Sequence, residues 1–279
     1  MRIAVASGKG GTGKTTVAVA LARLIGDSAF IDCDVEAPNA HLFLHPELEG
    51  SEKQEVMLPV VDESKCTGCG ECSRVCQFNA IAALGTNVIV FPELCHGCRA
   101  CVLICGPKAI SDGSREIGVI EWGHSQDILF YHARLRVSEP MSPPLIGALK
   151  ERAGSPREYV ILDCPPGTTC PMIEAVRGAD YCVLVTEPTP FGIHDLEMAA
   201  GAAKALSIPA GVVVNRVGIG DEAIESFCKE QGLPVLARIP HTREIAEGYA
   251  RGKSILETVP DLASSLSEAL EQIKRRSAA

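Results

Sequence analysis

A glycine-rich segment, SGKGGTGKTT at residues 7–16, constrains the fold more than any other part of the sequence. It follows a short apolar run at residues 2–7 and precedes an apolar-periodic stretch, residues 14–26, that predicts a helix ended by Gly26. Backbone N–H groups in such a turn, together with the positive end of the helix, bind phosphate. The order of strand, glycine turn and helix therefore predicts a nucleotide-binding loop, although a glycine turn without a ligand has the same local pattern.

The loop matches G-x-x-x-x-G-K-[ST], a pattern that gives its polar residues specific roles. We expect Lys14 to contact the β- and γ-phosphates and the Thr15 hydroxyl to bind Mg²⁺. The predicted nucleotide-binding residues in this loop are Gly8, Lys9, Gly10, Gly11, Thr12, Gly13, Lys14, Thr15 and Thr16.

The composition limits the remaining possibilities. The 279 residues suffice for one large α/β domain, or for one such domain with a small added module, and aromatic residues make up only 4%. With a formal net charge of −9 and no dense basic stripe, we expect no nucleic-acid partner. The first residues do not resemble a targeting peptide, and no apolar run reaches the length of a membrane span. We therefore expect a cytoplasmic protein with no membrane partner.

Lys9 is a second lysine where a phosphate loop needs only one. The segment KGGTGKTT, residues 9–16, resembles the deviant Walker A motif of the MinD/ParA/Mrp ATPases and the nitrogenase iron protein. The resemblance implies that Lys9 reaches across a dimer interface to ATP held by the other subunit. There a second cation would neutralise charge on the transferred phosphoryl group, as an arginine finger does. A solvated loop lysine is the alternative.

Three later segments extend this resemblance. In SAFIDCDVEAPN, residues 28–39, it implies that Asp34 positions the attacking water and the Mg²⁺ shell, whereas Asp32 has a structural or outer role. In EYVILDCPPGT, residues 158–168, it implies that Asp163 holds Mg²⁺ through water; capping the next helix is the alternative. The catalytic residues implied are Lys9, Lys14, Asp34 and Asp163, and the implied Mg²⁺ ligands are Thr15, Asp34 and Asp163. Asn215 and Arg216, at the end of a late strand, complete the implied ATP site, in which Asn215 contacts adenine.

Eight of the thirteen cysteines form two copies of C-x₂-C-x₂-C-x₃-C, which begin at Cys66 and Cys95. Every cysteine recurs 29 residues later, so the unit is duplicated. It resembles the bacterial two-cluster ferredoxin, in which the fourth cysteine of each run serves the other cluster. The resemblance implies one [4Fe–4S] cluster on Cys66, Cys69, Cys72 and Cys105, and a second on Cys76, Cys95, Cys98 and Cys101. Zinc in Cys₄ sites is the alternative.

Together the two resemblances indicate a MinD-superfamily P-loop ATPase with an inserted ferredoxin domain. The predicted fold is a mostly parallel α/β sheet with helices on both faces, formed by residues 1–54 and 115–279. An α+β ferredoxin-like domain is predicted at residues 55–114. Within this domain, short strands at 55–64 and 86–94 are expected before each cysteine run. After it, a hairpin is expected at residues 115–139.

The expected function is an ATP-binding and ATP-hydrolysing iron–sulfur protein. Dimerisation on ATP, as a homodimer or with a related ATPase, would move the switch segments and the clusters together. That motion would drive electron transfer, or assembly of a metal centre in a partner metalloprotein or redox protein. A MinD/ParA-type positioning switch with structural or redox-sensing clusters is one alternative, and a constitutive ferredoxin whose ATPase only controls docking is another.

A few other residues carry weaker expectations. Cys170 lies seven residues after Asp163, where the nitrogenase iron protein has a cysteine that ligates a shared cluster, but a buried thiol is favoured. His124 and His132 are expected at the surface of the hairpin. Cys33, Cys164, Cys182 and Cys228 are expected in the core, and Leu262, Leu266, Leu270 and Ile273 are expected to pack on the sheet.

Overall fold

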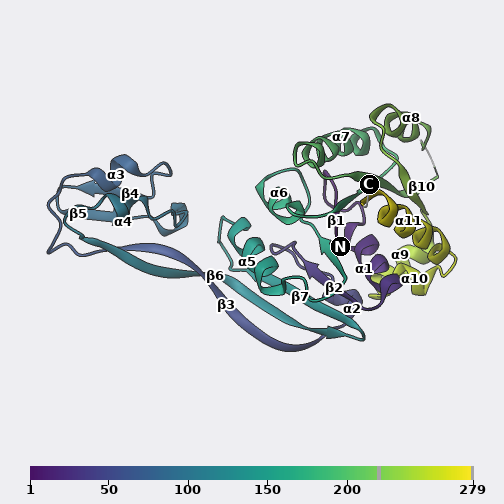
Figure 1. Ribbon diagram of the computed structural model, residues 1–279, viewed down its shortest axis with the longest axis horizontal. Helices are drawn as coiled ribbons and strands as arrows, with labels where there is room; N and C mark the ends of the chain where they lie inside the picture. Colours follow the sequence, from purple (N-terminus) through teal and green to yellow (C-terminus); the bar gives the residue numbers. More distant parts are fainter. Residues whose placement is uncertain (219–220, 278–279) are drawn as a thin grey trace.

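The computed structural model describes residues 1–218 and 221–277. In these residues nine strands form one sheet, with the order β11-β10-β9-β1-β8-β2-β7-β6-β3 (Figure 1). Neighbouring strands from β11 to β7 are parallel, whereas β6 and β3 are antiparallel additions at one edge. The parallel strands are β1 (Arg2–Ala6), β2 (Ser28–Asp32), β7 (Ile128–Leu135), β8 (Tyr159–Asp163), β9 (Tyr181–Thr186), β10 (Ala210–Val217) and β11 (Val235–Pro240).

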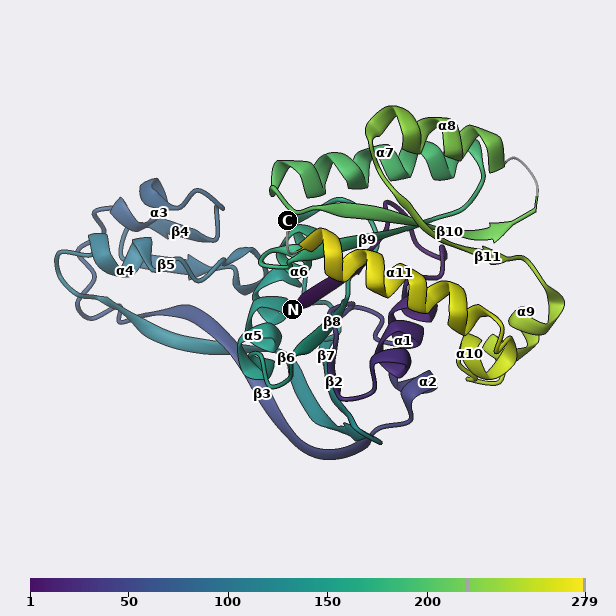
Figure 2. The ribbon, with the colours of Figure 1, turned by 45° about the vertical axis from the view of Figure 1, so that its right-hand side comes forward.

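Helices cover both faces of the sheet, which confirms the predicted mostly parallel α/β fold. Figure 2 shows α7 and α8 on one side of β10, and α1 and α11 on the other. The first face carries α5 (Pro143–Ala153), α6 (Cys170–Val176), α7 (Pro190–Ala205) and α8 (Asp221–Gln231). The second carries α1 (Lys14–Ile25), α2 (His41–Leu44), α9 (Arg243–Ala250), α10 (Ile255–Thr258) and α11 (Leu262–Ser277).

Each face has its own apolar cluster. The apolar residues that recur along α11 are all buried against the second face, as predicted from their spacing. Helix α1 ends at Gly26, whose positive φ of 76° suits a glycine and whose N–H bonds to the carbonyl of Ala22. The helix predicted at residues 14–26 is therefore confirmed.

A long antiparallel ribbon leaves the edge of the sheet. It is formed by β3 (Glu47–Val61) and β6 (Ile110–Ser125), which pair from Glu47 opposite His124 to Val61 opposite Ile110. The short strand expected at 55–64 is therefore wrong in length, because pairing along β6 extends it back to Glu47. The expected hairpin is confirmed: β6 turns at Gln126 and Asp127 and pairs with β7.

The far end of the ribbon holds a small outlying unit, residues 62–109 (Figure 1). It contains α3 (Glu71–Val75), β4 (Ile81–Leu84), β5 (Asn87–Val90), a 3₁₀ turn (Pro92–Leu94) and α4 (Ala100–Ile104). The strand expected over 86–94 is thus limited to β5. The duplication is visible in the backbone, since α3 and α4 begin 29 residues apart. Positive φ angles recur with the same offset at Gly68 and Gly97, Gly70 and Arg99, and Asn79 and Lys108.

Candidate functional site: a phosphate loop and two cysteine-lined cavities

The glycine-rich loop lies at the carboxyl end of β1, the strand between β8 and β9. Ligands bind at such central strand ends in open α/β sheets. Gly11 and Gly13 have φ angles of 80° and 94°, and a Cβ at Gly13 would lie 2.3 Å from the Asn215 side chain. The glycine at position 13 is therefore required by both conformation and space.

A cavity of about 370 Å³ opens beside this loop, a volume in the usual range for small-molecule sites. The structure brings most of the predicted ATP residues to its wall, together with residues of the β11–α9 segment. The predicted residues in the lining are Gly10, Gly11, Gly13, Lys14, Thr15, Thr16, Asp34, Asn215 and Arg216. Gly8, Lys9, Thr12 and Asp163 are not in the lining. His241 and Tyr249 also line it, and both lie in residues 237–252, a segment whose sequence resembles the strand and the loop over the base in the same family.

Asp163 ends β8 and is 1% exposed. Neither of its carboxylate oxygens has a hydrogen-bond partner among the described residues. Burial raises the pKa of Asp163 to about 7, against the opposing effects of the nearby Thr15 hydroxyl and of the Lys14 charge. A buried carboxylate without partners, close to a phosphate loop, fits a Mg²⁺ ion and its water shell.

The two aspartates after β2 differ in their surroundings. Asp32 is fully buried and accepts backbone N–H bonds from Asp34 at 3.1 Å and from Asn39 and Ala40 at 3.0 Å each. It therefore fixes the segment 34–40, in keeping with the structural role expected of it. Asp34 faces the cavity, where burial raises its pKa and the Lys14 charge lowers it.

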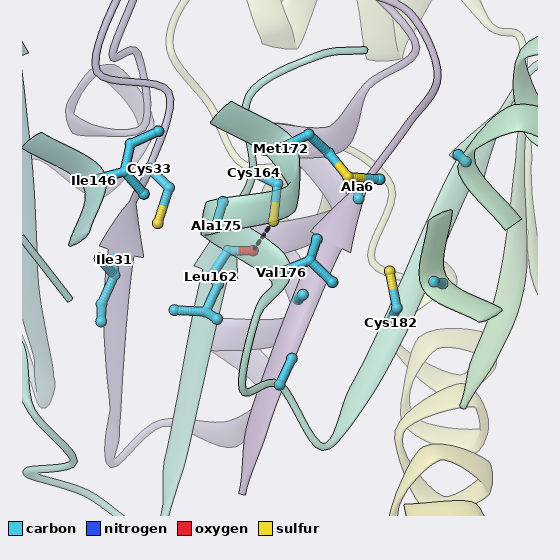
Figure 3. Close-up of a cluster of buried hydrophobic side chains, with 14 of the residues drawn as sticks. Ala6, Ile31, Cys33, Ile146, Leu162, Cys164, Met172, Ala175, Val176 and Cys182 are labelled. Atoms are coloured by element: carbon cyan, nitrogen blue, oxygen red, sulfur yellow. Dashed lines mark hydrogen bonds between the residues drawn. The ribbon is translucent and has the colours of Figure 1, made fainter. Parts of the chain in front are cut away.

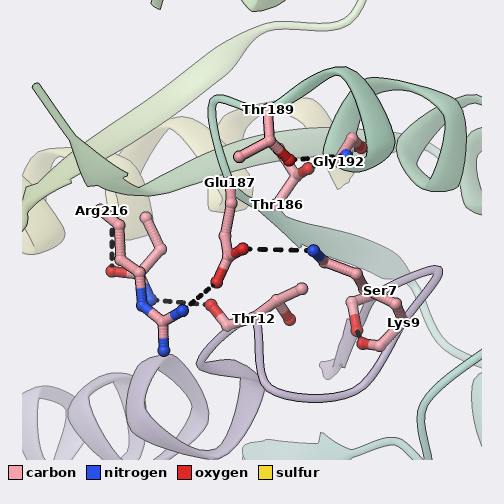
Figure 4. A network of polar contacts seen from close by, with 9 residues as sticks. Ser7, Lys9, Thr12, Thr186, Glu187, Thr189, Gly192 and Arg216 are labelled. Atoms are coloured by element: carbon pink, nitrogen blue, oxygen red, sulfur yellow. Dashed lines mark hydrogen bonds and ion pairs between the residues drawn. The ribbon is translucent and has the colours of Figure 1, made fainter. Parts of the chain in front are cut away.

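Lys9 is held within its own chain (Figure 4). Its Nζ lies 3.2 Å from Oε2 of Glu187, whose other oxygen accepts a hydrogen bond from Arg216. Glu187 follows β9 and is 8% exposed. Asn215, which was expected to contact adenine, donates from Nδ2 to the carbonyl of Thr12 at 2.7 Å. Sequence reasoning missed Glu187, although an acidic residue directly after the strand beside β1 was an available signal.

In the outlying unit, the eight cysteines of the two runs surround two cavities. Each cavity combines three cysteines of one run with the fourth of the other. One is lined by Cys66, Cys69, Cys72 and Cys105, and the other by Cys76, Cys95, Cys98 and Cys101. The two fourth cysteines have matching surroundings, since Sγ of Cys76 accepts from the Ala80 N–H at 3.3 Å and Sγ of Cys105 from the Ala109 N–H at 3.2 Å.

The cysteines line these cavities rather than meet at one point. Over residues 1–218 and 221–277, no group of three His, Cys, Asp or Glu side chains could hold a metal ion directly. The remaining lining is mostly apolar or backbone, including Val61, Val88 and Ile110 in the first cavity. Four thiols around an apolar cavity, with N–H groups directed at sulfur, fit an iron–sulfur cluster.

Two expectations about single residues are wrong. Cys170, expected as a buried thiol, is exposed, because it begins α6 where the turn after β8 faces solvent. His132, expected at the surface, is 4% exposed, because β7 lies inside the sheet between β2 and β6. Its Nε2 lies 3.0 Å from a carboxylate oxygen of Glu121. His124 is half exposed, as expected for a surface residue.

The other four cysteines are buried, as predicted. Figure 3 shows Cys33, Cys164 and Cys182 among the apolar side chains of the first face. Cys228 on α8 belongs to the same cluster. Burial raises the pKa of all four thiols, so they remain protonated and unreactive at neutral pH.

These features define a P-loop protein with a buried carboxylate at its phosphate site. A family model described as the CobQ/CobB/MinD/ParA nucleotide-binding domain matches residues 3–255. The chain therefore belongs to this nucleotide-binding family. No helix in the described part of the chain is both long and apolar enough to cross a membrane.

Individual relatives agree with this assignment. An uncharacterized protein of Methanocaldococcus jannaschii is 32% identical over 92% of this chain and 92% of its own length. An iron–sulfur cluster carrier protein of Pyrococcus horikoshii is 25% identical over 98% of this chain and 88% of its own length. Among solved structures, the Pyrococcus furiosus cell division ATPase MinD aligns with a TM-score of 0.61 at 19% identity, over 98% of each chain. MinD of Pyrococcus horikoshii, complexed with Mg-ADP, aligns with a TM-score of 0.60 at 18% identity, over 98% of this chain and 95% of that one. The fold is thus that of a MinD-like P-loop protein.

Proposed function

We propose that this protein hydrolyses ATP and uses the resulting switch motion to act through two [4Fe–4S] clusters on a partner. The client receives either electrons or a metal centre. The observation that carries the proposal is the arrangement of the eight cysteines around two cavities, on a ribbon that continues the nucleotide-binding sheet. The division proposed is an ATPase formed by residues 1–54 and 115–279, with a ferredoxin-like domain at residues 55–114.

The nucleotide half of the proposal rests on the phosphate loop. Lys14, which is 7% exposed, binds the β- and γ-phosphates, and Thr15, Asp34 and Asp163 hold Mg²⁺, which neutralises charge on the phosphates. The burial of Asp163, with neither carboxylate oxygen in a hydrogen bond among the described residues, supports its assignment, because a bound cation stabilises the ionised carboxylate. Asn215 and Arg216 lie on the wall where the base would bind.

Dimerisation is part of the proposal. Lys9 and its pair with Glu187 lie at the rim of the site, and the Lys9 side chain is 33% exposed, so it is accessible to a second protomer. A lysine that crosses to the partner's ATP would make hydrolysis depend on the dimer. A homodimer is the simplest form, and a heterodimer with a related ATPase uses the same contact.

The cluster half rests on the pairing of cysteines. Exchange of the fourth cysteine between runs ties α3 to α4, and the two helices pack against each other. The hydrogen bonds to Sγ of Cys76 and Cys105 would raise the potential of each cluster, since they stabilise its reduced, more negative form. The relatives named iron–sulfur cluster carrier proteins support delivery of a cluster as one of the two uses.

A redox titration of anaerobically purified protein, with ADP or with a non-hydrolysable ATP analogue, tests the proposal. We expect about eight irons per chain, and a cluster potential or transfer rate that differs between the two nucleotides. Lys14→Ala is the matched control, because it removes nucleotide binding without touching a cysteine. Zinc in place of iron would refute the clusters. Unchanged potentials together with ATP-dependent recruitment to a surface would favour the positioning switch instead.

A further inference from the structure

A set of buried polar contacts connects the outlying unit to the nucleotide site. Its centre is Arg115 on β6, whose side chain is only 10% exposed. The guanidinium forms a two-pronged ion pair with Glu139, whose side chain is 3% exposed. The same guanidinium donates from Nη2 to the carbonyl oxygen of Cys95 at 3.4 Å. Arg115 thus contacts the first cysteine of the second run and the body of the protein at once.

The contacts continue toward the phosphate loop through the segment 136–142, which joins β7 to α5. Glu139 accepts from the Met141 N–H at 3.3 Å. The next residue, Ser142, is 2% exposed and donates from Oγ to Oε1 of Glu36 at 2.9 Å. Glu36 lies two residues after Asp34, in the segment that Asp32 holds by three hydrogen bonds. A movement of the segment 34–40 would therefore reach Ser142 through this hydrogen bond.

Other ion pairs along the ribbon differ in burial. Lys53 and Glu116 pair across β3 and β6, one residue from Arg115, with side chains that are 72% and 33% exposed. Exposed pairs fix little geometry, whereas a buried arginine fork on a carboxylate fixes both position and orientation. The first cysteine run is held locally, since the Cys69 carbonyl accepts from Arg74 of the same run.

We propose that Arg115, Glu139 and Ser142 are positioning residues that transmit the nucleotide state of the segment 34–40 to the second cysteine run. The inference rests on the proposed function and assigns it a route. This route makes the two cysteine runs unequal, because the contacts from Arg115 reach the second run at Cys95. We therefore expect residues 93–99 to respond to nucleotide more than residues 66–72. Coupling of this kind is reciprocal, so changes at Cys95 also alter nucleotide affinity.

Amide hydrogen exchange on the iron-loaded protein tests the route, with ADP compared against a non-hydrolysable ATP analogue. In the unaltered protein, exchange in residues 93–99 should differ severalfold between the two nucleotides. Ser142→Ala, and separately the double variant Arg115→Met/Glu139→Leu, should lose most of that difference. The double variant replaces the whole pair with apolar side chains, so no buried charge is left unpaired. Iron content and the nucleotide response of residues 34–40 should stay within about twofold.

Lys53→Met/Glu116→Gln is the matched control and should keep the full response. The route is overturned if both test variants respond like the unaltered protein. It is also overturned if the unaltered protein responds at residues 34–40 but not at 93–99, a result that leaves the proposed function standing. Absence of iron, or of any nucleotide response, removes the proposed function and the route together.

Discussion

The body of the molecule and its outlying unit differ in how much apolar surface they bury. The body has an extensive cluster on each face of the sheet, with large buried side chains such as Phe30, Tyr181 and Leu149. Among the described residues, the buried cluster at the outlying unit consists of Cys72, Ile81 and Cys101 from the unit itself and Ile110 from the adjoining end of β6. Half of that cluster is cysteine.

This difference indicates what each part needs in order to fold. A segment of this size with so small a core is not stabilised enough by burial and requires metal, disulfides or a partner. Burial raises the pKa of the Cys72 and Cys101 thiols, so without metal they are neutral. In the proposed function, metal binding would release protons and supply folding free energy to this unit. We therefore expect the body to fold without its ligand and the outlying unit to fold only with metal.

The largest expected effect is that of replacing a cluster cysteine, which should affect the outlying unit but not the body. Cys72→Ala or Cys101→Ala should remove at least four of about eight irons and the exchange protection of residues 62–109. The single tryptophan, Trp122, packs on the core of the body, so its thermal unfolding signal should be retained. The control is Cys228→Ala, a buried thiol of the body, and it should lose no iron. Full iron content in both cluster variants would refute the comparison.

The next largest effect is that of a substitution in the phosphate loop, which should affect the body but not the outlying unit. Lys14→Ala should reduce ATP affinity at least about 100-fold, because the ammonium group that contacts the β- and γ-phosphates is lost. Iron content should not change. Isothermal titration measures the affinity, with the exposed Lys253→Ala as the matched control. Affinity equal to that of the control would contradict the role given to the loop.

Lys9→Ala should have a smaller and more selective effect. ATP affinity should stay within about threefold, while turnover and ATP-dependent dimerisation fall about 100-fold, as for loss of one transition-state donor. Phosphate release and light scattering measure the two. Normal turnover in this variant would place Lys9 outside the reaction, in the ion pair with Glu187 alone.

The smallest expected effect is on how the stability of the body depends on pH. Burial lowers the pKa of His132 and of His41, so the folded body binds fewer protons at these groups than the unfolded chain. Their contribution to stability is present above the unfolded value of about 6.5 and is lost as the pH falls below it, at about 1.4 kcal/mol per pKa unit of depression. His132→Gln should make the Trp122 unfolding midpoint less dependent on pH between 5 and 7. A pH slope equal to that of the unaltered protein would reject this assignment.

Much of the fold and of the candidate site could be predicted, because the signals are local. Glycines between an apolar run and an apolar-periodic stretch predict the loop at residues 7–16, and a 29-residue repeat predicts that α3 and α4 are equivalent. The contacts missed depend on residues far apart in the chain. Glu187 meets Lys9, and Glu139 meets Arg115, only after the sheet has formed. Likewise, the burial of His132 follows from its strand lying inside the sheet.

The ribbon passes beyond the sheet at paired positions, with Gln54 opposite Gly118, the residue at which the pairing of β6 with β7 ends. Excision of everything beyond that pair would bring together two chain ends that already lie side by side, and a tight turn would close them. The order and the connections of the strands from β11 to β7 would not change. An ancestral gene could therefore acquire or discard the cysteine-bearing appendage in a single step, with its ATP-handling scaffold intact.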